Sequence, residues 1–278
     1  MAATKRVLLT GASGFVGRHT QTRLLELGYE VHAVGFRATN DWVHPGVHAH
    51  TCDLLDDRAH AALCQSVRPT HMLHLAWCAT PGKFWTSLDN LSWVSASLDM
   101  TRAFAEAGGT RAVYAGTCAE YDWSFGRCSE QKTPLRPDTL YGTCKHALQS
   151  ILAQAHDAMG LSIGWGRLFF IYGSHETEGR LVSSVATSLL KGETISCSHG
   201  QQVRDFMHIQ DVADAMVALL DSPVTGPVNI ASGDARPVAD VIQLIGEATG
   251  RLELVRWGAR QGHGHEPERI EADVSRLA

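Results

Sequence analysis

The first seventeen residues join a short apolar run to a glycine-rich turn. Residues 5–10 read Lys-Arg-Val-Leu-Leu-Thr, which is typical of a strand buried in a parallel sheet. Gly11 then permits a tight turn, Gly14 lets the backbone approach a pyrophosphate, and Gly17 allows a helix to pack closely on the sheet. The first turn of that helix offers unpaired N–H groups to phosphates. We therefore predict a dinucleotide-binding fold rather than a purely structural glycine turn.

Strand and helix patterns alternate along the rest of the chain. Strands are expected at 30–34, 47–51, 72–76, 111–116 and 162–170, and helices at 18–27, 58–67, 93–107 and 141–159. This alternation predicts an α/β fold in which residues 1–171 form a Rossmann-type doubly wound parallel sheet. Residues 172–278 are predicted to form a smaller C-terminal α/β substrate-binding lobe, with some segments returning to the main sheet.

Composition limits the possible partners and compartment. The chain has 278 residues, a net charge of −5 and no run rich in lysine and arginine, so we expect no nucleic-acid partner. No signal-peptide pattern is found near the start and no apolar run is long enough to cross a bilayer, so we expect no membrane partner and a cytoplasmic location. The seven cysteines form no C-x-x-C pair and are expected to be reduced thiols.

The residues expected to contact the cofactor follow the predicted strands. They are Gly11, Ser13, Gly14, Phe15, Val16, Arg37, Asp53, Leu54 and Ala76, together with Tyr141 and Lys145. The second strand is followed by Gly35-Phe36-Arg37 and lacks the acidic residue that would bind the 2′-hydroxyl of the adenosine ribose. A guanidinium suits a 2′-phosphate, so the sequence favours NADP(H), with NAD(H) possible. Asp53 could equally cap the helix that follows it.

Tyr141 and Lys145 lie four residues apart in a predicted helix, so their side chains project from one face. We expect the ammonium to lower the pKa of the phenol and to enable acid–base chemistry, although the two residues could also be an ordinary surface pair. Thr117 follows the fifth predicted strand, where its hydroxyl could hold a substrate oxygen or simply cap a turn.

Four segments match motifs that occur together in one protein family. They are residues 10–17 (T-G-x-x-G-x-x-G), 141–145 (Y-x-x-x-K), 117–121 (a Thr four residues before a Tyr) and 204–213 (similar to R-D-F-x-H-V-x-D-V-A). In these segments the chain resembles the extended short-chain dehydrogenase/reductases, also called the NAD-dependent epimerase/dehydratase family of nucleotide-sugar enzymes. The resemblance runs almost from end to end and implies a homodimer formed through the helices at 93–107 and 141–159.

The same resemblance implies roles for individual residues. Thr117, Tyr141 and Lys145 would be catalytic, and Lys145 would also hold the nicotinamide ribose. Arg204 would contact the diphosphate of a nucleotide sugar, with Arg180 assisting. An alternative for Arg204 is a salt bridge with the neighbouring aspartate, which would order the lobe. Ser97 stands where many members carry an asparagine that supports the lysine through water.

The departures from the family pattern bear on the reaction. Cys118 and Ala119 stand where sugar 4,6-dehydratases usually have an acid pair, and Ala119 also stands where epimerase-reductases place a cysteine. The resemblance therefore favours NAD(P)-dependent reduction of a nucleotide-linked keto-sugar of the 4-keto-6-deoxyhexose type, with Tyr141 as proton donor. Two alternatives remain open: a nucleotide-sugar 4-epimerase with retained NAD, and a non-catalytic dinucleotide-sensing protein.

Two groups of histidines raise the possibility of a metal site. One comprises His44, His48 and His50, and the other lies in the Gly-His-Gly-His-Glu run at 262–266. Neither group forms a familiar zinc signature, so the sequence alone predicts no metal ligands.

Overall fold

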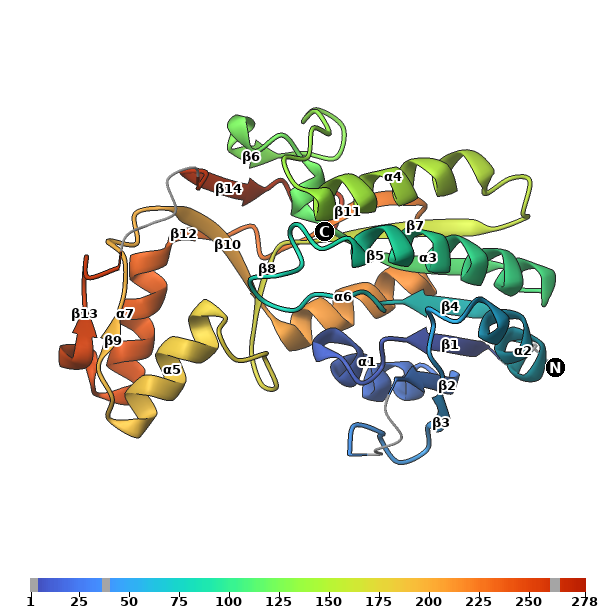
Figure 1. The fold of residues 1–278 in the computed structure, drawn as a ribbon, viewed down its shortest axis with the longest axis horizontal. Helices are drawn as coiled ribbons and strands as arrows, with labels where there is room; N and C mark the ends of the chain where they lie inside the picture. The colour runs from blue at the N-terminus through green and yellow to red at the C-terminus, as the bar shows by residue number, and fades with distance from the viewer. Residues whose placement is uncertain (1–4, 37–40, 261–265) are drawn as a thin grey trace.

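The computed structural model describes residues 5–36, 41–260 and 266–278. Its main sheet has seven strands in the order β11-β7-β5-β4-β1-β2-β3, and every neighbouring pair is parallel (Figure 1). The strands are β1 (Arg6–Thr10), β2 (Glu30–Gly35), β3 (His48–Thr51), β4 (His71–His74), β5 (Arg111–Thr117), β7 (Ser162–Leu168) and β11 (Gly226–Ile230). The strand order reverses between β1 and β4, which places the ligand-binding crevice of such a sheet beside the glycine turn. The predicted doubly wound α/β fold is confirmed.

Helices cover both faces of this sheet. The helices α1 (Phe15–Glu26) and α6 (Ile209–Asp221) cover one face, and α2 (Asp57–Val67), α3 (Asp89–Glu106) and α4 (Leu140–Ala155) cover the other (Figure 1). Successive strand residues point to opposite faces, so Leu9 packs with α1 and α6 while Leu8 packs with α2 to α4. Burial on both faces explains why the central strands are almost continuously apolar. Among the described residues, the helices include none with the length and apolarity needed to span a bilayer.

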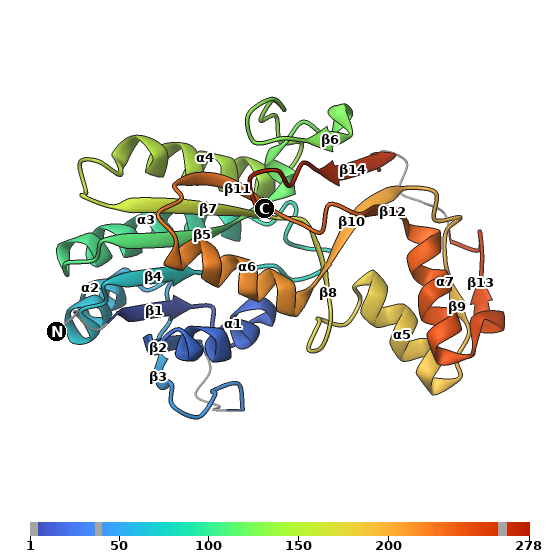
Figure 2. The same cartoon turned by 180° about the vertical axis from the view of Figure 1, so that it is seen from behind.

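A smaller unit lies beyond the carboxyl ends of the strands, most clearly seen in the reverse view (Figure 2). Its helices are α5 (Leu181–Lys191) and α7 (Val238–Thr249), and its strands are β8 (Phe170–Tyr172), β9 (Ile195–Ser196), β10 (Val203–His208), β12 (Ala235–Pro237) and β13 (Val255–Arg256). The strand β10 joins a second sheet of order β12-β10-β14-β6, which includes β14 (Arg269–Ala272) and β6 (Arg127–Cys128), and it also pairs with β8. Val185, Leu189 and Ile242 form part of a separate apolar core between α5 and α7.

The structure differs from the sequence-based elements in a few places. The predicted strand at 162–170 is divided, because β7 pairs within the main sheet whereas β8 leaves it to pair with β10. The helix α4 ends at Ala155 rather than at residue 159. The strands β6, β10 and β14 were not foreseen. The helix α6 and strand β11 follow residue 172 but lie with the main sheet, and the division at 171/172 stays a prediction.

Candidate active site

The glycine turn between β1 and α1 has no room for side chains. Gly11 has a φ of 68°, and a Cβ atom there would lie 2.7 Å from the backbone nitrogen of Ala76. A Cβ atom at Gly17 would lie 2.3 Å from the carbonyl oxygen of Gly11, so the helix packs directly on the turn. Gly14 precedes α1 without a side chain to cap it, and the first turn of the helix has no acidic residue. These features leave helical N–H groups for an anion, and they fit the pyrophosphate of a dinucleotide.

The other predicted cofactor residues surround this turn. Ser13 accepts a hydrogen bond from Arg18 Nε through its carbonyl oxygen at 3.0 Å. Phe15 and Val16 begin α1, and Ala76 follows β4. Leu54 is buried in the core beside α2. Arg37 lies outside the described residues.

Asp53 does not cap α2, as the sequence had allowed. Its carboxylate accepts a hydrogen bond from the backbone nitrogen of Leu55 at 2.9 Å. The capping residue is Asp56, whose side chain accepts from the backbone nitrogen of Arg58. Asp53 is exposed at the end of β3.

The start of α4 is held against the segment that follows β5. Thr117 ends β5 and is followed by a short 3₁₀ helix, η1 (Cys118–Glu120). A Cβ atom at Gly142 would lie 2.3 Å from the carbonyl oxygen of Ala119, so only glycine allows this approach. The side chain of Thr139 caps α4 by accepting from the Gly142 nitrogen at 3.1 Å. Tyr141 is thereby brought to Thr117, and the two side chains make a polar contact.

Aromatic side chains surround the Tyr141 ring. The centroids of Phe84, Trp85 and Trp77 lie 4.9, 5.8 and 6.4 Å from the centroid of Tyr141. The carbonyl oxygen of Trp85 also accepts a hydrogen bond from the Tyr141 backbone nitrogen at 3.2 Å. The segment between β4 and α3 therefore packs against the Tyr141 ring, which stays partly exposed.

The pKa of Tyr141 shifts in the opposite direction from the one predicted. Burial raises the pKa of the phenol above its ordinary value, and the contact with Thr117 and the charge of Arg180 oppose this rise only in part. The groups that act on the phenol are Thr117, Cys118, Glu120 and Arg180, so the expected lowering by Lys145 is not found. In this structure, Tyr141 is therefore a protonated phenol at neutral pH.

Lys145 is buried one helical turn after Tyr141. Its Nζ atom donates a hydrogen bond to the carbonyl oxygen of Ala115 at 2.8 Å and lies 3.7 Å from the centroid of the Trp77 ring. Burial lowers the pKa of Lys145 to about 7, although the charge of Glu120 acts in the opposite direction. The amine can therefore gain or lose a proton near neutral pH, which is common at functional sites.

A neutral histidine supports the sheet beneath this site. His74 lies between the hydroxyl of Thr10, 2.9 Å from Nδ1, and the hydroxyl of Ser97, 3.0 Å from Nε2. Burial lowers the pKa of His74 to about 3, so it stays uncharged. Ser97 thus links α3 to β4 through His74. Its predicted water-mediated support of Lys145 stays a prediction.

The two predicted substrate arginines lie in different settings. Arg180 is exposed just before α5, with its guanidinium carbon 5.5 Å from the centroid of Phe84. Because Phe84 also packs against Tyr141, at 4.9 Å between ring centroids, Arg180 lies on the same side of the molecule as the phenol. Arg204 is buried on β10, donates to the Val203 carbonyl oxygen at 2.8 Å and pairs with Glu266 at 3.3 Å.

The alternative salt bridge between Arg204 and Asp205 is wrong. Asp205 accepts hydrogen bonds from the backbone nitrogen and hydroxyl of Ser232 and from the backbone nitrogen of Gly233. It therefore fastens β10 to the segment after β11. Arg204 faces Glu266 instead.

Sequence reasoning missed three side chains that shape the site. Phe84 and Trp85 belong to a segment without regular secondary structure, and the adjacent aromatic pair was the available signal. Glu120 is fully buried, and its Oε1 accepts from the backbone nitrogen of Thr117 at 2.8 Å and from Trp165 Nε1 at 2.9 Å. Glu120 therefore holds the backbone of Thr117 in place.

Comparisons with known proteins agree with this architecture. Residues 7–231 match the family described as the NAD dependent epimerase/dehydratase family. UDP-glucuronic acid decarboxylase 1 of Xenopus tropicalis is 26% identical over 257 residues, which cover 88% of this chain and 61% of that protein. The chain thus spans about three fifths of the length of that relative.

Two other similar proteins match over nearly the whole chain. The dTDP-6-deoxy-L-talose 4-dehydrogenase (NAD(P)(+)) of Kitasatospora kifunensis is 26% identical over 287 residues, or 98% of this chain and 88% of that protein. The crystal structure of Thermus thermophilus UDP-glucose 4-epimerase complexed with NAD has a TM-score of 0.85 and 26% identity, covering 98% of this chain and 91% of that one. With its matching family model, parallel sheet and glycine turn, this chain belongs to the NAD-dependent epimerase/dehydratase family.

Proposed function

We propose that the protein reduces a nucleotide-linked keto-sugar of the 4-keto-6-deoxyhexose type, with Tyr141 donating the proton. The observation that carries this proposal is the contact of the Tyr141 phenol with Thr117, with the buried amine of Lys145 one helical turn away. Reduction of a ketone requires an acid that gives a proton to the developing alkoxide. The similarity to a dTDP-6-deoxy-L-talose 4-dehydrogenase supports a 6-deoxysugar nucleotide as substrate, since the reverse of dehydrogenation at C4 is reduction of a 4-keto group.

The residues around Tyr141 have complementary roles in this proposal. A bound nicotinamide cofactor would supply the hydride. The N–H groups at the start of α1 would hold its pyrophosphate, and Lys145 would hold the nicotinamide ribose. The Thr117 hydroxyl would donate a hydrogen bond to the developing alkoxide, where charge appears. Phe84 and Trp85 would exclude water from the phenol.

Two arginines are proposed to bind the diphosphate of the substrate. Arg204 is buried and its guanidinium can form two parallel hydrogen bonds to a phosphate. Its partner Glu266 is about two-fifths exposed, so a phosphate could replace that carboxylate. Arg180 precedes α5 and lies near the aromatic segment that covers Tyr141.

NADP(H) is the proposed cofactor, with NAD(H) as the second choice. The end of β2 carries Gly35 and Phe36 in place of an acidic residue that would bind a ribose 2′-hydroxyl and repel a 2′-phosphate. Freshly purified protein should bind NADPH more tightly than NADH. Tighter binding of NADH would overturn the cofactor preference without affecting the role of Tyr141.

The decisive test of the proton donor is Tyr141→Phe. We expect turnover of nucleotide-linked 4-keto-6-deoxyhexoses to fall at least about a hundredfold, while the cofactor still binds. The matched control is Tyr29→Phe, which removes a phenol hydroxyl that donates to Asp221 at 2.7 Å, away from the catalytic edge. Near-normal turnover in Tyr141→Phe would rule out this residue as the donor.

A nucleotide-sugar 4-epimerase with retained NAD is the second candidate. It is favoured by the similarity to the Thermus thermophilus UDP-glucose 4-epimerase, whose structure contains NAD. Mass spectrometry of the untreated protein separates the two candidates. Stoichiometric bound NAD, with interconversion of a nucleotide sugar in the absence of added cofactor, would favour the epimerase. Cofactor binding without either activity would favour the sensing role.

Homodimer formation and a cytoplasmic location stay predictions. The helices expected at the dimer interface, α3 and α4, carry the exposed apolar side chains Leu91 and Ile151. Light scattering at several protein concentrations would give the mass of the assembly. A monomer at all concentrations would contradict the expected dimer.

A further inference from the structure

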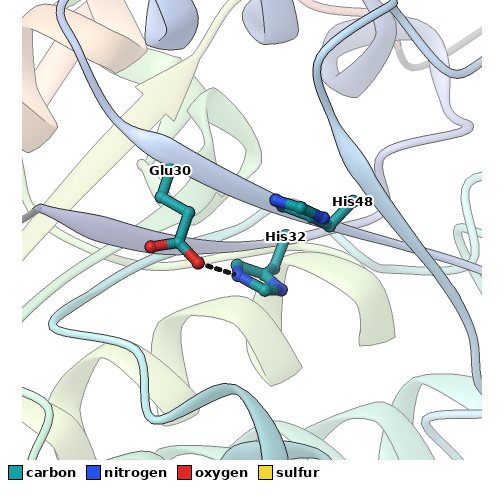
Figure 3. Close-up of side chains that lie close together, drawn as sticks. All are labelled: Glu30, His32 and His48. Carbon is teal, nitrogen blue, oxygen red and sulfur yellow. Dashed lines mark hydrogen bonds and ion pairs between the residues drawn. The ribbon is translucent and has the colours of Figure 1, made fainter.

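Four polar side chains that the proposed function does not use gather at the outer edge of the main sheet. Glu30 and His32 lie on β2, and His48 and His50 lie on the edge strand β3. His32 pairs in register with His48, and Val34 pairs with His50. Residues two apart on a strand share a face, so all four side chains project from the same side of the sheet. Figure 3 shows Glu30, His32 and His48 close together.

Three of these residues lie close enough to bind one metal ion. One ligand atom from each of Glu30, His32 and His48 lies within 4.8 Å of the other two. His32 Nε2 is 3.0 Å from Glu30 Oε1. Two ligands of a tetrahedral zinc ion, each bonded at about 2.0–2.1 Å, are about 3.3 Å apart. His48 is exposed and stacks on the His32 ring at 4.8 Å between centroids, so a rotation of its side chain would bring its nitrogen closer.

The fourth residue is placed to orient a ligand. His32 Nδ1 lies 2.9 Å from His50 Nε2. A histidine that binds a metal through one ring nitrogen almost always donates a hydrogen bond through the other. A neutral His50 imidazole can accept that hydrogen bond through its unprotonated nitrogen.

We propose that Glu30, His32 and His48 form a site for a divalent metal ion of the zinc class that links β2 to the edge strand β3. Two imidazoles and one carboxylate suit Zn²⁺, whereas Mg²⁺ and Ca²⁺ prefer oxygen ligands alone. The remaining coordination position is open to water. Arg6 Nε lies 3.0 Å from Glu30 Oε1, and its positive charge lowers the affinity of the site for a cation.

Zinc binding to the full chain, produced without an affinity tag and stripped with a chelator, tests this site. Calorimetry and metal analysis should give one zinc ion per chain, and magnesium should not compete. At a zinc concentration about a hundredfold above Kd, Tm should rise by about 5 °C.

Two variants locate the site. His48→Ala removes an exposed ligand, and Glu30→Gln keeps a hydrogen-bond acceptor for His32 but removes the charge. Each should weaken zinc binding at least about tenfold. The matched control is His44→Ala, because His44 is exposed on the segment before β3 and, among the described residues, its ring hydrogen-bonds the Pro45 oxygen alone. The His44→Ala variant should bind zinc with the same affinity as the unmodified protein.

Two outcomes would overturn the proposal. One is zinc binding that is unchanged in both His48→Ala and Glu30→Gln, which would place the ion elsewhere. The other is the absence of zinc binding to the stripped protein. NADPH binding by the same variants should be unchanged, so the metal site and the proposed reductase activity can fail independently.

Discussion

Two buried cations near the catalytic edge have opposite surroundings. Arg167, on β7, is fully buried with its Nε atom 2.8 Å from Glu120 Oε2 and its Nη1 atom 3.0 Å from the Tyr121 hydroxyl. Lys145, on α4, is also buried but hydrogen-bonds a neutral carbonyl oxygen. Burial lowers the pKa of each, but in Arg167 the effects of Glu120 and Tyr121 prevail and raise it. The paired cation is therefore permanently charged, while the other can lose its proton.

This difference indicates a structural role for Arg167 and a chemical role for Lys145. Glu120 connects the two regions, because it pairs with Arg167 and also accepts a hydrogen bond from the Thr117 backbone. The Glu120–Arg167 pair thus holds the Thr117 backbone in place. The protonation of Lys145, in contrast, can change with pH or when a ligand binds.

The largest expected effect is on stability, from Arg167→Met. Removing the guanidinium leaves the Glu120 carboxylate buried without a counter-charge, so the free energy of unfolding should fall by about 3–5 kcal/mol. Urea denaturation measures this. The control Arg102→Met breaks an exposed pair with Asp99 and should cost about 0.5 kcal/mol or less. A loss below about 1 kcal/mol in Arg167→Met would remove the distinction between the two cations.

Lys145→Met should have the opposite effect, with a large loss of activity and no loss of stability. We expect kcat/KM to fall at least about a hundredfold, which corresponds to about 2.7 kcal/mol of transition-state stabilisation. Stability should be unchanged or higher at neutral pH, because an amine without a carboxylate partner is replaced by an apolar side chain of similar length. If Lys145→Met loses as much stability as Arg167→Met, the lysine is structural.

The pH dependence of stability sharpens the same contrast. The folded protein releases the Lys145 proton near pH 7, whereas the unfolded chain keeps it until about pH 10.5. The unfolded state therefore binds more protons in this interval, and the contribution of Lys145 to stability rises with pH by up to about 1.4 kcal/mol per unit. Urea denaturation from about pH 6 to 9 should show this rise in the unmodified protein relative to Lys145→Met. Parallel pH profiles would contradict the lowered pKa.

Arg204 differs from both of these cations, because it has a carboxylate partner, Glu266, but that partner is partly exposed and can be displaced. Arg204→Ala should raise the KM for the nucleotide sugar about tenfold while NADPH affinity is unchanged. Glu266→Gln should lower KM if the carboxylate competes with the substrate diphosphate. An unchanged KM in Arg204→Ala would assign the arginine to the stability of the lobe.

The sequence was sufficient for the main parallel sheet because the decisive residues are local. Gly11, Gly14 and Gly17 follow an apolar strand within one short segment, and the periodicity of the later elements gave the parallel sheet. Thr117, Tyr141 and Lys145 were named from motifs, and the close approach at Gly142 brings the first two together.

What the sequence did not predict depends on contacts between distant segments. The raised pKa of Tyr141 arises from its burial, and Phe84 and Trp85, more than fifty residues earlier in the chain, cover its ring. The pair formed by Glu120 and Arg167 crosses between neighbouring elements. Likewise, His32 and His48 meet only because of the register between β2 and β3.

The position of Trp77 gives the protein an optical signal of its own. The Lys145 amine lies 3.7 Å from the centre of the indole ring, so loss of its charge changes the electric field at a fluorophore. Tryptophan emission should therefore titrate near neutral pH, and it should change when a ligand binds the amine. The fold brings the Trp77 indole and the titrating Lys145 amine together, so the protonation of the amine can be followed without an added label.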